Sequence, residues 1–458
     1  MRIWTNTMGL KSSAKPSKLE AWLDSDIART TQACVKCGKC VPSCTIYRIH
    51  KDETTSPRGF LDLIALVKQE SLELNTPLKH IFESCFLCTT CVQVCPFHLP
   101  IDSMIEKVRV LSARKHGIAW HKKLYFYLLK HPKLMDFVFS LCSVSAPCAF
   151  KQVGDKIHWR FQALAPKSLA KRALFPFART SFLRTHQGTI PPKAPLENMP
   201  AKSVGIFIGC LGNYNYPSVG KSLLTILDKL NISAHIPKQF CCGAPAFFTG
   251  DIDTALYLAQ RNVDLLTETA MHTETILVPE ATCISMLKKD YQHVFESIPD
   301  PKARQEWLEK WRKVADKLQF ASSFLTHNSA LLEVLKTYPK NPLTLTYHDP
   351  CHAKKVLGVY KEPRALLGAN FSLSEMAESD RCCGFGGVSM QSDHYALSVQ
   401  AGLPKAKDIA NTKAQVVSAE CSACRVQLNN ALHQIDAPTR FLHPLELIAQ
   451  VLQTPKTC

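Results

Sequence analysis

The sequence has 458 residues, of which 46% are hydrophobic and 20% charged, so it is long enough for about two to four domains with cores of their own. This composition argues against a wholly disordered chain. Lys and Arg outnumber Asp and Glu by 55 to 38, a formal net charge of +17. Such an excess suits an acidic partner protein or an anionic membrane surface. No helix-turn-helix or RNA-binding signature is present, so nucleic acid is not an expected partner.

Eight cysteines near the amino terminus form two runs of identical C-x2-C-x2-C-x3-C spacing, offset by 51 residues, and Pro96 follows the second run. This is the bacterial ferredoxin pattern, in which the fourth cysteine of each run ligates the other cluster. The spacing predicts two [4Fe-4S] clusters, one held by Cys34, Cys37, Cys40 and Cys95 and the other by Cys85, Cys88, Cys91 and Cys44. Zinc would require paired C-x2-C units. Disulfides would require an oxidising compartment, for which the sequence has no export signal.

The full count is twenty cysteines. Without a signal peptide, so many thiols indicate a reducing compartment and metal ligation, and the protein is expected to be cytoplasmic. Three cysteines have no ligand spacing. We expect Cys142 and Cys148 to be buried small hydrophobes, and Cys458 to be a bystander at a frayed terminus.

The segment between the two runs is longer than small two-cluster ferredoxins allow. Residues 56–59 read as a turn, and the apolar residues of 60–67 recur at helical spacing. After Pro100 a further helix is expected through Leu111. The helical insertion resembles the α-helical ferredoxin domain of fumarate reductase iron–sulfur subunits and heterodisulfide reductases. We therefore assign residues 1–110 to an α-helical ferredoxin domain.

Residues 115–150 are basic and aromatic, with an apolar piece from Phe137 to Phe150. No stretch reaches the roughly 20 apolar residues of a membrane span. Such a segment can lie in a bilayer interface, pack on a partner subunit, or pack inside the protein, and the sequence leaves these alternatives open. The proline-rich stretch from Thr185 to Ser203 is interpreted as a linker. Residues 111–200 thus form a basic helical segment plus linker.

A second, different repeat follows the linker. Its cysteines are Cys210, Cys241, Cys242 and Cys283 in the first copy, and Cys351, Cys382, Cys383, Cys421 and Cys424 in the second. Pairing Cys283 with Cys421 gives offsets of 141, 141 and 138 residues. Short strands are expected at 204–208, 276–278, 343–347 and 415–417, and helices at 254–266 and 284–291. The fold class is thus α+β or α/β, an α-helical dicluster domain followed by two pseudo-symmetric α/β repeats at 201–335 and 336–458.

The expected strand–cysteine–helix order has a chemical consequence. A thiolate between the carboxyl end of a strand and a helix amino terminus has a lowered pKa and receives backbone N–H groups. Gly243 and Gly384, which follow the paired cysteines, let the backbone approach a cluster closely.

The Cys-Cys-Gly copies resemble the cysteine-rich domain of heterodisulfide reductases and of the iron–sulfur subunits of glycerol-3-phosphate, glycolate and lactate dehydrogenases. The arrangement is most similar to the glycolate oxidase iron–sulfur subunit family, and residues 348–352, His-Asp-Pro-Cys-His, match the family's stretch. The resemblance implies that these cysteines hold a further iron–sulfur cluster, of a five-cysteine non-cubane kind, or zinc. The first repeat departs from the motif, with Met286 taken to stand where the second has Cys424.

The sequence shows no dinucleotide fingerprint, P-loop or serine–histidine arrangement. A chain with clusters but no organic cofactor site relays electrons for another subunit. The resemblance implies an electron-transfer subunit of a glycolate or D-lactate dehydrogenase, working between a FAD-containing subunit and the quinone pool on the inner face of the cytoplasmic membrane. The alternatives are a glycerol-3-phosphate dehydrogenase subunit and a heterodisulfide-reductase-like chain whose repeats are catalytic, or dock on the membrane. A structural zinc-stapled docking module is a third hypothesis.

Overall fold

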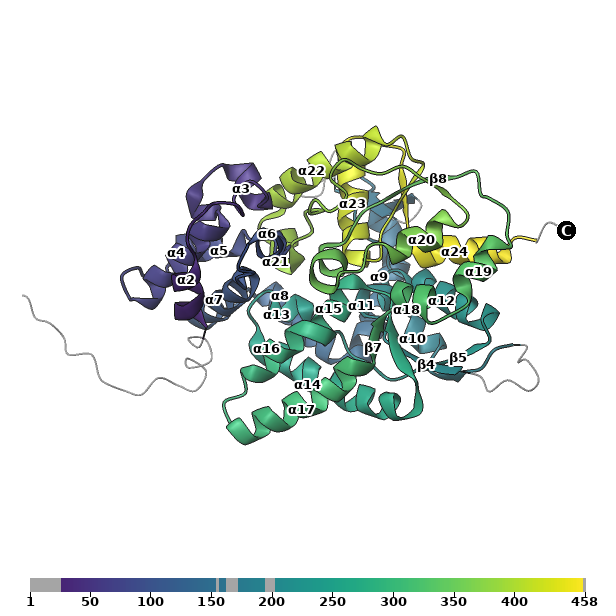
Figure 1. Ribbon diagram of the computed structural model, residues 1–458, viewed down its shortest axis with the longest axis horizontal. Coiled ribbons are helices and arrows are strands. Elements are labelled where there is room, and N and C mark those ends of the chain that lie inside the picture. The colour runs from purple at the N-terminus through teal and green to yellow at the C-terminus, as the bar shows by residue number, and fades with distance from the viewer. Residues whose placement is uncertain (1–25, 154–155, 162–171, 194–201, 456–458) are drawn as a thin grey trace, which may run out of the picture.

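The computed structural model describes residues 26–153, 156–161, 172–193 and 202–455. It is a mixed α and β structure in three parts (Figure 1). A helical amino-terminal part, purple in the figure, lies at one end of the molecule. The two cysteine-rich repeats lie beside it, repeat one in teal and green and repeat two in light green and yellow. Cys458 is outside the described residues.

From residue 26 onward, the amino-terminal part is built of helices without strands. They are α2 (Ile27–Ala33), α3 (Thr45–His50), α4 (Pro57–Lys68), α5 (Thr76–Glu83), α6 (Thr90–Val94) and α7 (Ile101–His116), with a 3-10 turn at Glu53–Thr55. The helices predicted over 60–67 and after Pro100 are confirmed as α4 and α7. Their apolar faces are buried, as with Phe60, Ile64 and Met104.

The turn predicted at residues 56–59 is wrong, because these residues begin α4. Ser56 is the N-cap, and its Oγ accepts a hydrogen bond of 3.0 Å from the backbone N–H of Gly59. Pro57 takes the first helical position, where its missing N–H costs nothing. Serine followed by proline therefore begins a helix here.

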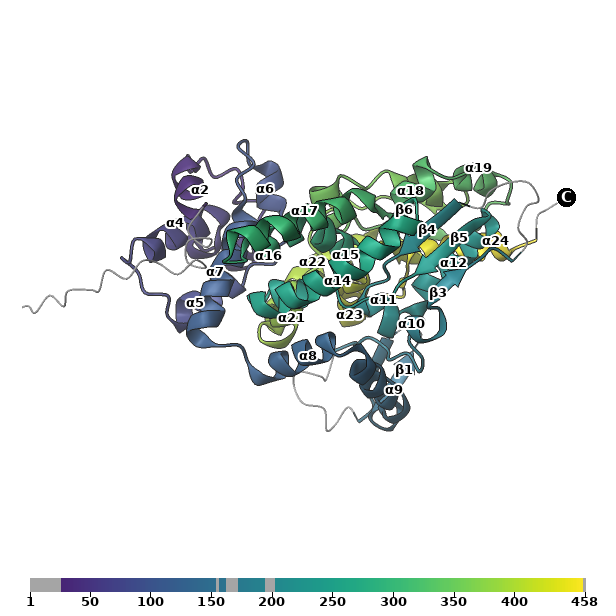
Figure 2. The same ribbon diagram turned by 90° about the horizontal axis from the view of Figure 1, so that it is seen from below.

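The basic, aromatic segment forms α8 (Trp120–Lys130) and α9 (Pro132–Ala149), followed by a hairpin of β1 (Phe150–Val153) and β2 (Lys156–Trp159) and by α10 (Phe182–Thr185). Figure 2 shows α8 and α9 along one edge of the molecule. Among the described residues, no helix combines the length and apolar character needed to cross a bilayer. One face of the segment packs inside, since Phe126, Leu129 and Met135 are buried.

Repeat one is built on a five-stranded sheet of order β3-β5-β4-β6-β7. Its elements are β3 (Gly188–Ile190), β4 (Lys202–Ile206), α11 (Cys210–Tyr214), α12 (Pro217–Lys229), β5 (Ile232–Ile236), α13 (Ala244–Phe247), α14 (Ile252–His272), β6 (Thr275–Val278), α15 (Ala281–Ser285), a π turn at Met286–Asp290, α16 (Tyr291–Glu296), α17 (Pro301–Lys317), β7 (Leu318–Phe320), α18 (Ala321–His327) and α19 (Leu331–Lys336).

Repeat two is built on a four-stranded sheet of order β11-β10-β8-β9. Its elements are β8 (Thr344–Tyr347), a π turn at His352–Val356, α20 (Glu362–Gly368), β9 (Ser372–Leu373), α21 (Gly387–Ser392), α22 (Tyr395–Asn411), β10 (Val416–Ser418), α23 (Ser422–Gln434), β11 (Arg440–Leu442) and α24 (Pro444–Gln453).

The strands predicted around the cysteines agree with β4, β6, β8 and β10 to within two residues. The helix predicted at 254–266 lies inside the longer α14, and the one predicted at 284–291 spans the end of α15, the π turn and the first residue of α16. The linker predicted from Thr185 to Ser203 is wrong in part, because β3 pairs antiparallel with β5, Thr189 opposite His235. Proline-rich composition did not prevent a short edge strand there, since its prolines follow the strand. Residues 194–201 of that stretch lie outside the described residues.

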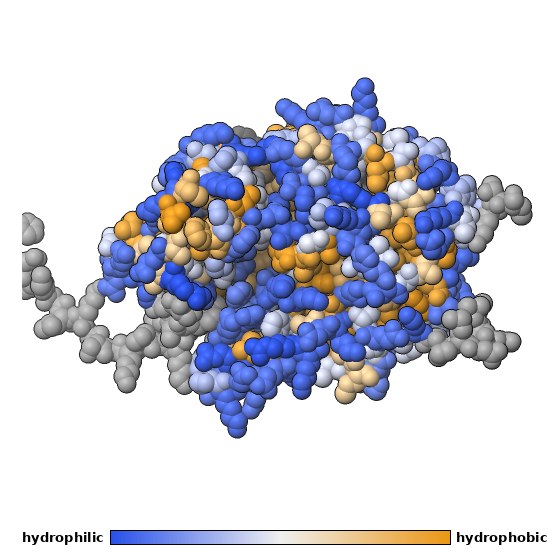
Figure 3. Space-filling view, viewed as in Figure 1, coloured by the Kyte–Doolittle hydropathy of each residue, from blue (hydrophilic) through white to orange (hydrophobic). Residues whose placement is uncertain are grey.

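Apart from β3, the strands of both sheets run parallel. Their spatial order is also the same in the two repeats, β5-β4-β6-β7 in repeat one and β9-β8-β10-β11 in repeat two. In parallel sheets the carboxyl ends of neighbouring strands meet at one edge, which is where β4, β6, β8 and β10 deliver the cysteines. The repeats share one buried core containing Leu223 of α12 and Ile448 of α24. Figure 3 shows hydrophobic residues gathered where the two repeats meet, and a second group over the amino-terminal part, on a face that is elsewhere largely hydrophilic.

Candidate metal centres

The first site of the amino-terminal part brings together Cys34, Cys37, Cys40 and Cys95, which line one cavity of about 20 Å³. Cys95, from the second run, lies close enough to Cys40 to raise its pKa together with Cys34 and Cys37, although burial is the main cause of that rise. The crossing of the fourth cysteine that the spacing predicts is therefore present in the geometry. Cys37 is exposed, so this site lies at the surface.

The second site brings together Cys44, Cys85, Cys88 and Cys91 around another cavity of about 20 Å³. Burial raises the pKa of the Cys85 thiol to about 11 and of the Cys44 thiol to about 12. The backbone N–H of Leu87 donates to the Cys85 sulfur at 3.5 Å. Four thiols with a backbone donor match the ligands of a [4Fe-4S] cluster, so the residues present fit the group.

The two loops share a backbone conformation that explains how they wrap a site. Lys36 and Gly38 have positive φ angles of 55° and 78°, and their counterparts Leu87 and Thr89 have 50° and 56°. Left-handed residues between successive cysteines turn each thiol toward the same centre. Lys36, Leu87 and Thr89 are not glycines, so their positive φ angles put backbone strain into both loops.

Repeat one brings its four predicted cysteines together. The sulfurs of Cys210 and Cys241 are 3.7 Å apart. Hydrogen bonds from Cys241 and Cys283 lower the pKa of the Cys242 thiol. Cys210 begins α11 and Cys283 lies in α15, so two of the four thiols lie near helix amino termini as predicted.

Repeat two brings its five predicted cysteines to the corresponding place. The sulfurs of Cys383 and Cys424 are 3.5 Å apart, and the N–H of Gly384 donates to the Cys382 sulfur at 3.4 Å. Hydrogen bonds from Cys382 and Cys424 lower the pKa of Cys383 to about 6. Gly384 has φ +89°, and a Cβ there would lie 2.8 Å from the Ser398 carbonyl oxygen, so a side chain at 384 would push the loop off α22.

The structure corrects the pairing of the last cysteines. Glu280 is the N-cap of α15 and Cys421 the N-cap of α23, while Cys283 and Cys424 are each the third residue of those helices. Cys283 therefore corresponds to Cys424, and the offset is 141 throughout. The residue of repeat one that replaces the fifth cysteine is Glu280, not Met286. Cys283 and Cys421 are each the first cysteine after β6 and β10, but they occupy different positions relative to the helix that follows.

Glu280 has a defined task of its own. Its carboxylate accepts a hydrogen bond of 2.7 Å from the backbone N–H of Ser422 and another from the Ser422 hydroxyl. It thus caps α23, the helix that carries Cys424, from the other repeat. Burial raises the pKa of Glu280 to about 7. Glu280 is present in the sequence three residues before Cys283, but only the helix starts show that it occupies the position that Cys421 has in repeat two.

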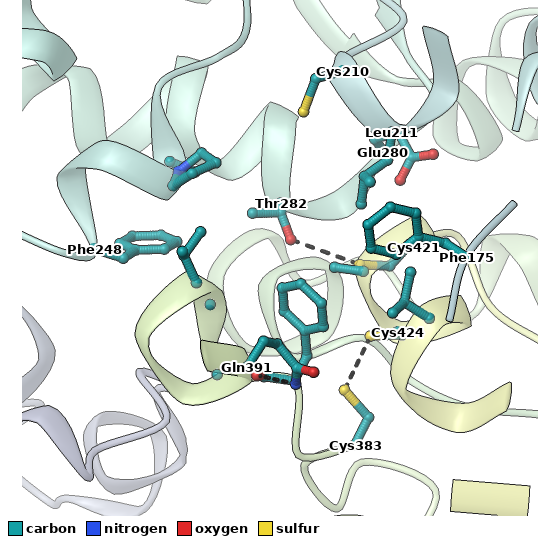
Figure 4. A pocket seen from close by; sticks show the side chains of 18 of the residues that line it. Phe175, Cys210, Leu211, Phe248, Glu280, Thr282, Cys383, Gln391, Cys421 and Cys424 are labelled. Carbon is teal, nitrogen blue, oxygen red and sulfur yellow. Dashed lines mark hydrogen bonds between the residues drawn. The ribbon is translucent and has the colours of Figure 1, made fainter. Parts of the chain in front are cut away.

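One cavity joins the two repeats (Figure 4). Its volume is about 370 Å³, and it is lined by thiols of both repeats, including Cys210, Cys383 and Cys421, together with Phe175 and Phe248. In the close-up, Cys210 comes from one side of the cavity and Cys383, Cys421 and Cys424 from the other. The two repeats therefore present their sulfur ligands to a shared interior.

The second site of the amino-terminal part adjoins repeat two. The Cys88 thiol is hydrogen-bonded with that of Cys382, an interaction that raises the pKa of Cys88. Lys355 of repeat two donates to Thr90 Oγ1 at 2.5 Å and to the Asp380 carbonyl at 2.9 Å. This contact was not predictable from the sequence, because neither cysteine motif contains information about where the other lies in space.

Two further cysteines lie outside these groups. Cys142 is partly buried, and Cys148 is exposed at the end of α9. The expectation that Cys148 is a buried hydrophobe is wrong, because the last turn of α9 faces solvent.

Known protein families match the same regions. Residues 30–99 match the family described as 4Fe-4S dicluster domain, and residues 204–288 and 345–429 match the cysteine-rich domain. The chain is 25% identical over 431 residues to the probable glycolate oxidase iron-sulfur subunit of Bacillus subtilis (strain 168), covering 91% of this chain and 93% of that protein.

Two other relatives match the chain, one over nearly its whole length and one over about half of it. A subunit of the anaerobic glycerol-3-phosphate dehydrogenase of Escherichia coli (strain K12) is 25% identical over 424 residues, with 92% of this chain and 98% of that protein covered. Lactate utilization protein A of Bacillus subtilis (strain 168) is 29% identical over 249 residues, with 54% and 98% covered. This chain thus carries a 4Fe-4S dicluster domain followed by two copies of the cysteine-rich domain.

Proposed function

We propose that this chain is the electron-transfer subunit of a 2-hydroxy-acid dehydrogenase, glycolate or D-lactate being the donor, and that it works between a FAD-containing partner and the quinone pool. The observation that carries the proposal is the contact between Cys88 and Cys382, which sets the dicluster part directly against repeat two. The relatives include subunits of glycolate oxidase and glycerol-3-phosphate dehydrogenase, which supports an electron-transfer component of an oxidoreductase.

In this proposal, Cys34, Cys37, Cys40 and Cys95 hold one [4Fe-4S] cluster, and Cys85, Cys88, Cys91 and Cys44 hold the other. Cys351, Cys382, Cys383, Cys421 and Cys424 hold a further iron–sulfur centre, and Cys210, Cys241, Cys242 and Cys283 a four-thiolate metal site. A reduced flavin carries two electrons, and bound iron–sulfur clusters would accept them one at a time. We also take 201–335 and 336–458 as pseudo-symmetric repeats, because their parallel strands follow one order.

The protein's own side chains hold the dicluster part in place. Arg48 of α3 forms an ion pair of 2.7 Å with Glu378 of repeat two. Lys355 joins Thr90, beside Cys91, to the loop before Cys382. These polar links join the dicluster part to the segment just before Cys382, and so help to hold Cys88 and Cys382 together.

The function is tested with the purified subunits. Anaerobically purified protein is expected to contain at least eight iron and eight sulfide, since its two ferredoxin sites alone require about that many. Its visible absorption should bleach when the flavoprotein and hydroxy acid are added, and return on addition of a quinone. Bleaching with glycerol 3-phosphate and its dehydrogenase, but not with a hydroxy acid, would contradict the substrate assignment.

A second candidate function is favoured by the shared cavity. Thiols from both repeats facing one interior of about 370 Å³ would suit disulfide reduction between two metal centres. The same preparation separates the two functions. Dithiol-linked disulfide reduction by this chain without any flavoprotein would support the second candidate and contradict the first.

We further propose that α8 and α9 attach the protein to the inner face of the cytoplasmic membrane. Large apolar side chains recur at three- and four-residue spacing on the outer face of each helix. Their exposed fractions are Trp120 76%, Leu124 53%, Tyr127 48%, Leu134 40%, Phe137 67%, Leu141 57% and Val144 66%. Lys123 and Lys133 are exposed nearby. An apolar helix face with basic neighbours fits the surface of an anionic bilayer.

Replacing Phe137 and Leu141 together by aspartate is expected to abolish flotation of the protein with vesicles containing phosphatidylglycerol. The substitutions remove buried apolar area and add charge repelled by the lipid. High salt should also weaken binding of the unchanged protein, because it screens headgroup attraction. The control is Met271→Asp, at a 69% exposed apolar position on α14. Retention on vesicles only when the flavoprotein is present would assign this face to a contact with that partner.

A further inference from the structure

His348 lies directly after β8, at the strand end that delivers the cysteines of repeat two. Its ring is buried, with 1% of the residue exposed. One ring nitrogen of His348 and the sulfurs of Cys383 and Cys424 all lie within 4.8 Å of one another. Bond lengths of about 2.1 Å to nitrogen and 2.3 Å to sulfur place two such ligands about 3.6 Å apart on a tetrahedral metal. A small side-chain adjustment would thus bring all three onto one metal.

The ring has the orientation that metal-binding histidines show. Its Nδ1 lies 3.2 Å from the carbonyl oxygen of Ser379, to which it donates a hydrogen bond when that nitrogen carries the proton. A backbone carbonyl on one ring nitrogen fixes the tautomer and leaves the other nitrogen free to bind metal. That other nitrogen, Nε2, is buried and has no hydrogen-bond partner among the described residues. Buried polar atoms without a partner are rare and need an explanation.

We propose that His348 Nε2 is a nitrogen ligand of the metal centre of repeat two, beside Cys383 and Cys424. The assignment rests on the proposed function in one respect, namely that repeat two holds a metal centre. It explains the orphaned nitrogen, which no hydrogen bond within the described residues satisfies.

The two repeats differ at this position. With the offset of 141 residues, His348 corresponds to Phe207, which is fully buried in repeat one. Repeat one therefore lacks both this nitrogen and the fifth thiol, while repeat two has both. A neutral imidazole donates less negative charge than a thiolate, and histidine ligation raises the reduction potential of iron–sulfur centres relative to all-cysteine ligation. The proposal thus makes repeat two the stronger electron acceptor of the two sites.

The test is pulsed electron paramagnetic resonance on the full-length, anaerobically purified protein, grown with either natural or ¹⁵N-labelled histidine. The centre of repeat two is expected to show a directly coordinated nitrogen coupling that changes on labelling. His348→Phe should remove this coupling, and phenylalanine is chosen because repeat one holds Phe207 buried at the corresponding position. His352→Phe is the matched control. The Nδ1 of His352 lies 3.7 Å from the Cys351 sulfur, but His352 is not part of the group that His348 forms with Cys383 and Cys424. The His352→Phe protein should therefore keep the nitrogen coupling.

Labelling the unchanged protein decides the question even if His348→Phe fails to fold. A third centre without histidine nitrogen coupling, or one that keeps the coupling in His348→Phe, overturns the proposal while leaving the electron-transfer function intact. If repeat two holds zinc, X-ray absorption at the zinc edge should show one nitrogen among the sulfurs, and an all-sulfur shell overturns the proposal. Absence of any metal in repeat two would overturn both this proposal and the assignment of a centre there.

Discussion

Cys383→Ser is expected to abolish electron transfer to quinone while leaving the signals of both [4Fe-4S] clusters intact. Cys383 lies 3.5 Å from Cys424, among the five thiols of repeat two, and its neighbour Cys382 contacts Cys88 of the dicluster part. Serine has the same size as cysteine but is a poor ligand for iron. The loss should therefore be confined to the third centre and to turnover with the flavoprotein partner.

The matched control is Cys242→Ser, at the corresponding position of repeat one. Repeat one has only four thiols, because Glu280 replaces the fifth and is engaged in capping α23. This variant should chiefly lower thermal stability and keep most of the activity. Quinone reduction and cluster signals are measured on both variants at equal metal content. An inactive Cys242 variant of unchanged stability beside an active Cys383 variant would reverse the roles of the repeats.

Arg109→Met is expected to destabilise the protein by about 3 kcal/mol or more. The guanidinium of Arg109 is buried on α7 and donates to the carbonyl oxygens of Phe82, Glu83, Cys85 and Phe248, at distances from 2.6 to 3.3 Å. Methionine keeps the apolar stem but removes the guanidinium donors from these carbonyls, of which that of Phe82 still accepts a hydrogen bond of 3.4 Å from the Cys85 N–H. Since Phe248 belongs to repeat one, the variant should also loosen the dicluster part from the repeats.

Denaturant unfolding followed by cluster absorption measures the effect, with hydrogen exchange of residues 82–85 and 248–250 as a local readout. Arg114→Ala is the control on the same helix. Its ion pair with Asp253, 2.8 Å long, is more than half exposed on both sides, so its loss should cost no more than about 1 kcal/mol. Equal losses in the two variants would show that the buried carbonyl contacts do not hold these parts together.

The ferredoxin part was predictable because local rules govern it. Ligand geometry ties the thiols that are three residues apart to one centre and the fourth cysteine, four residues farther on, to the other centre, so the spacing alone indicated that Cys95 joins Cys34, Cys37 and Cys40. The strands before Cys210 and Cys351 were readable for a similar reason, since short apolar runs end at the cysteines. Serine followed by proline occurs both in turns and at helix starts, so these two residues alone did not predict the start of α4. The helix that follows them makes Ser56 an N-cap.

The sequence by itself indicated which cysteines come together, and with them the dicluster domain and the two cysteine-rich copies. Tertiary structure alone decided the pairing of the repeats through Glu280 and Cys421, the meeting of Cys88 with Cys382, and the free nitrogen of His348. It also divided α8 and α9 into a buried face and an exposed apolar face. The physical reason is range: spacing and periodicity encode contacts within a few turns of chain. Contacts between distant segments depend on how whole surfaces pack, which no local pattern records.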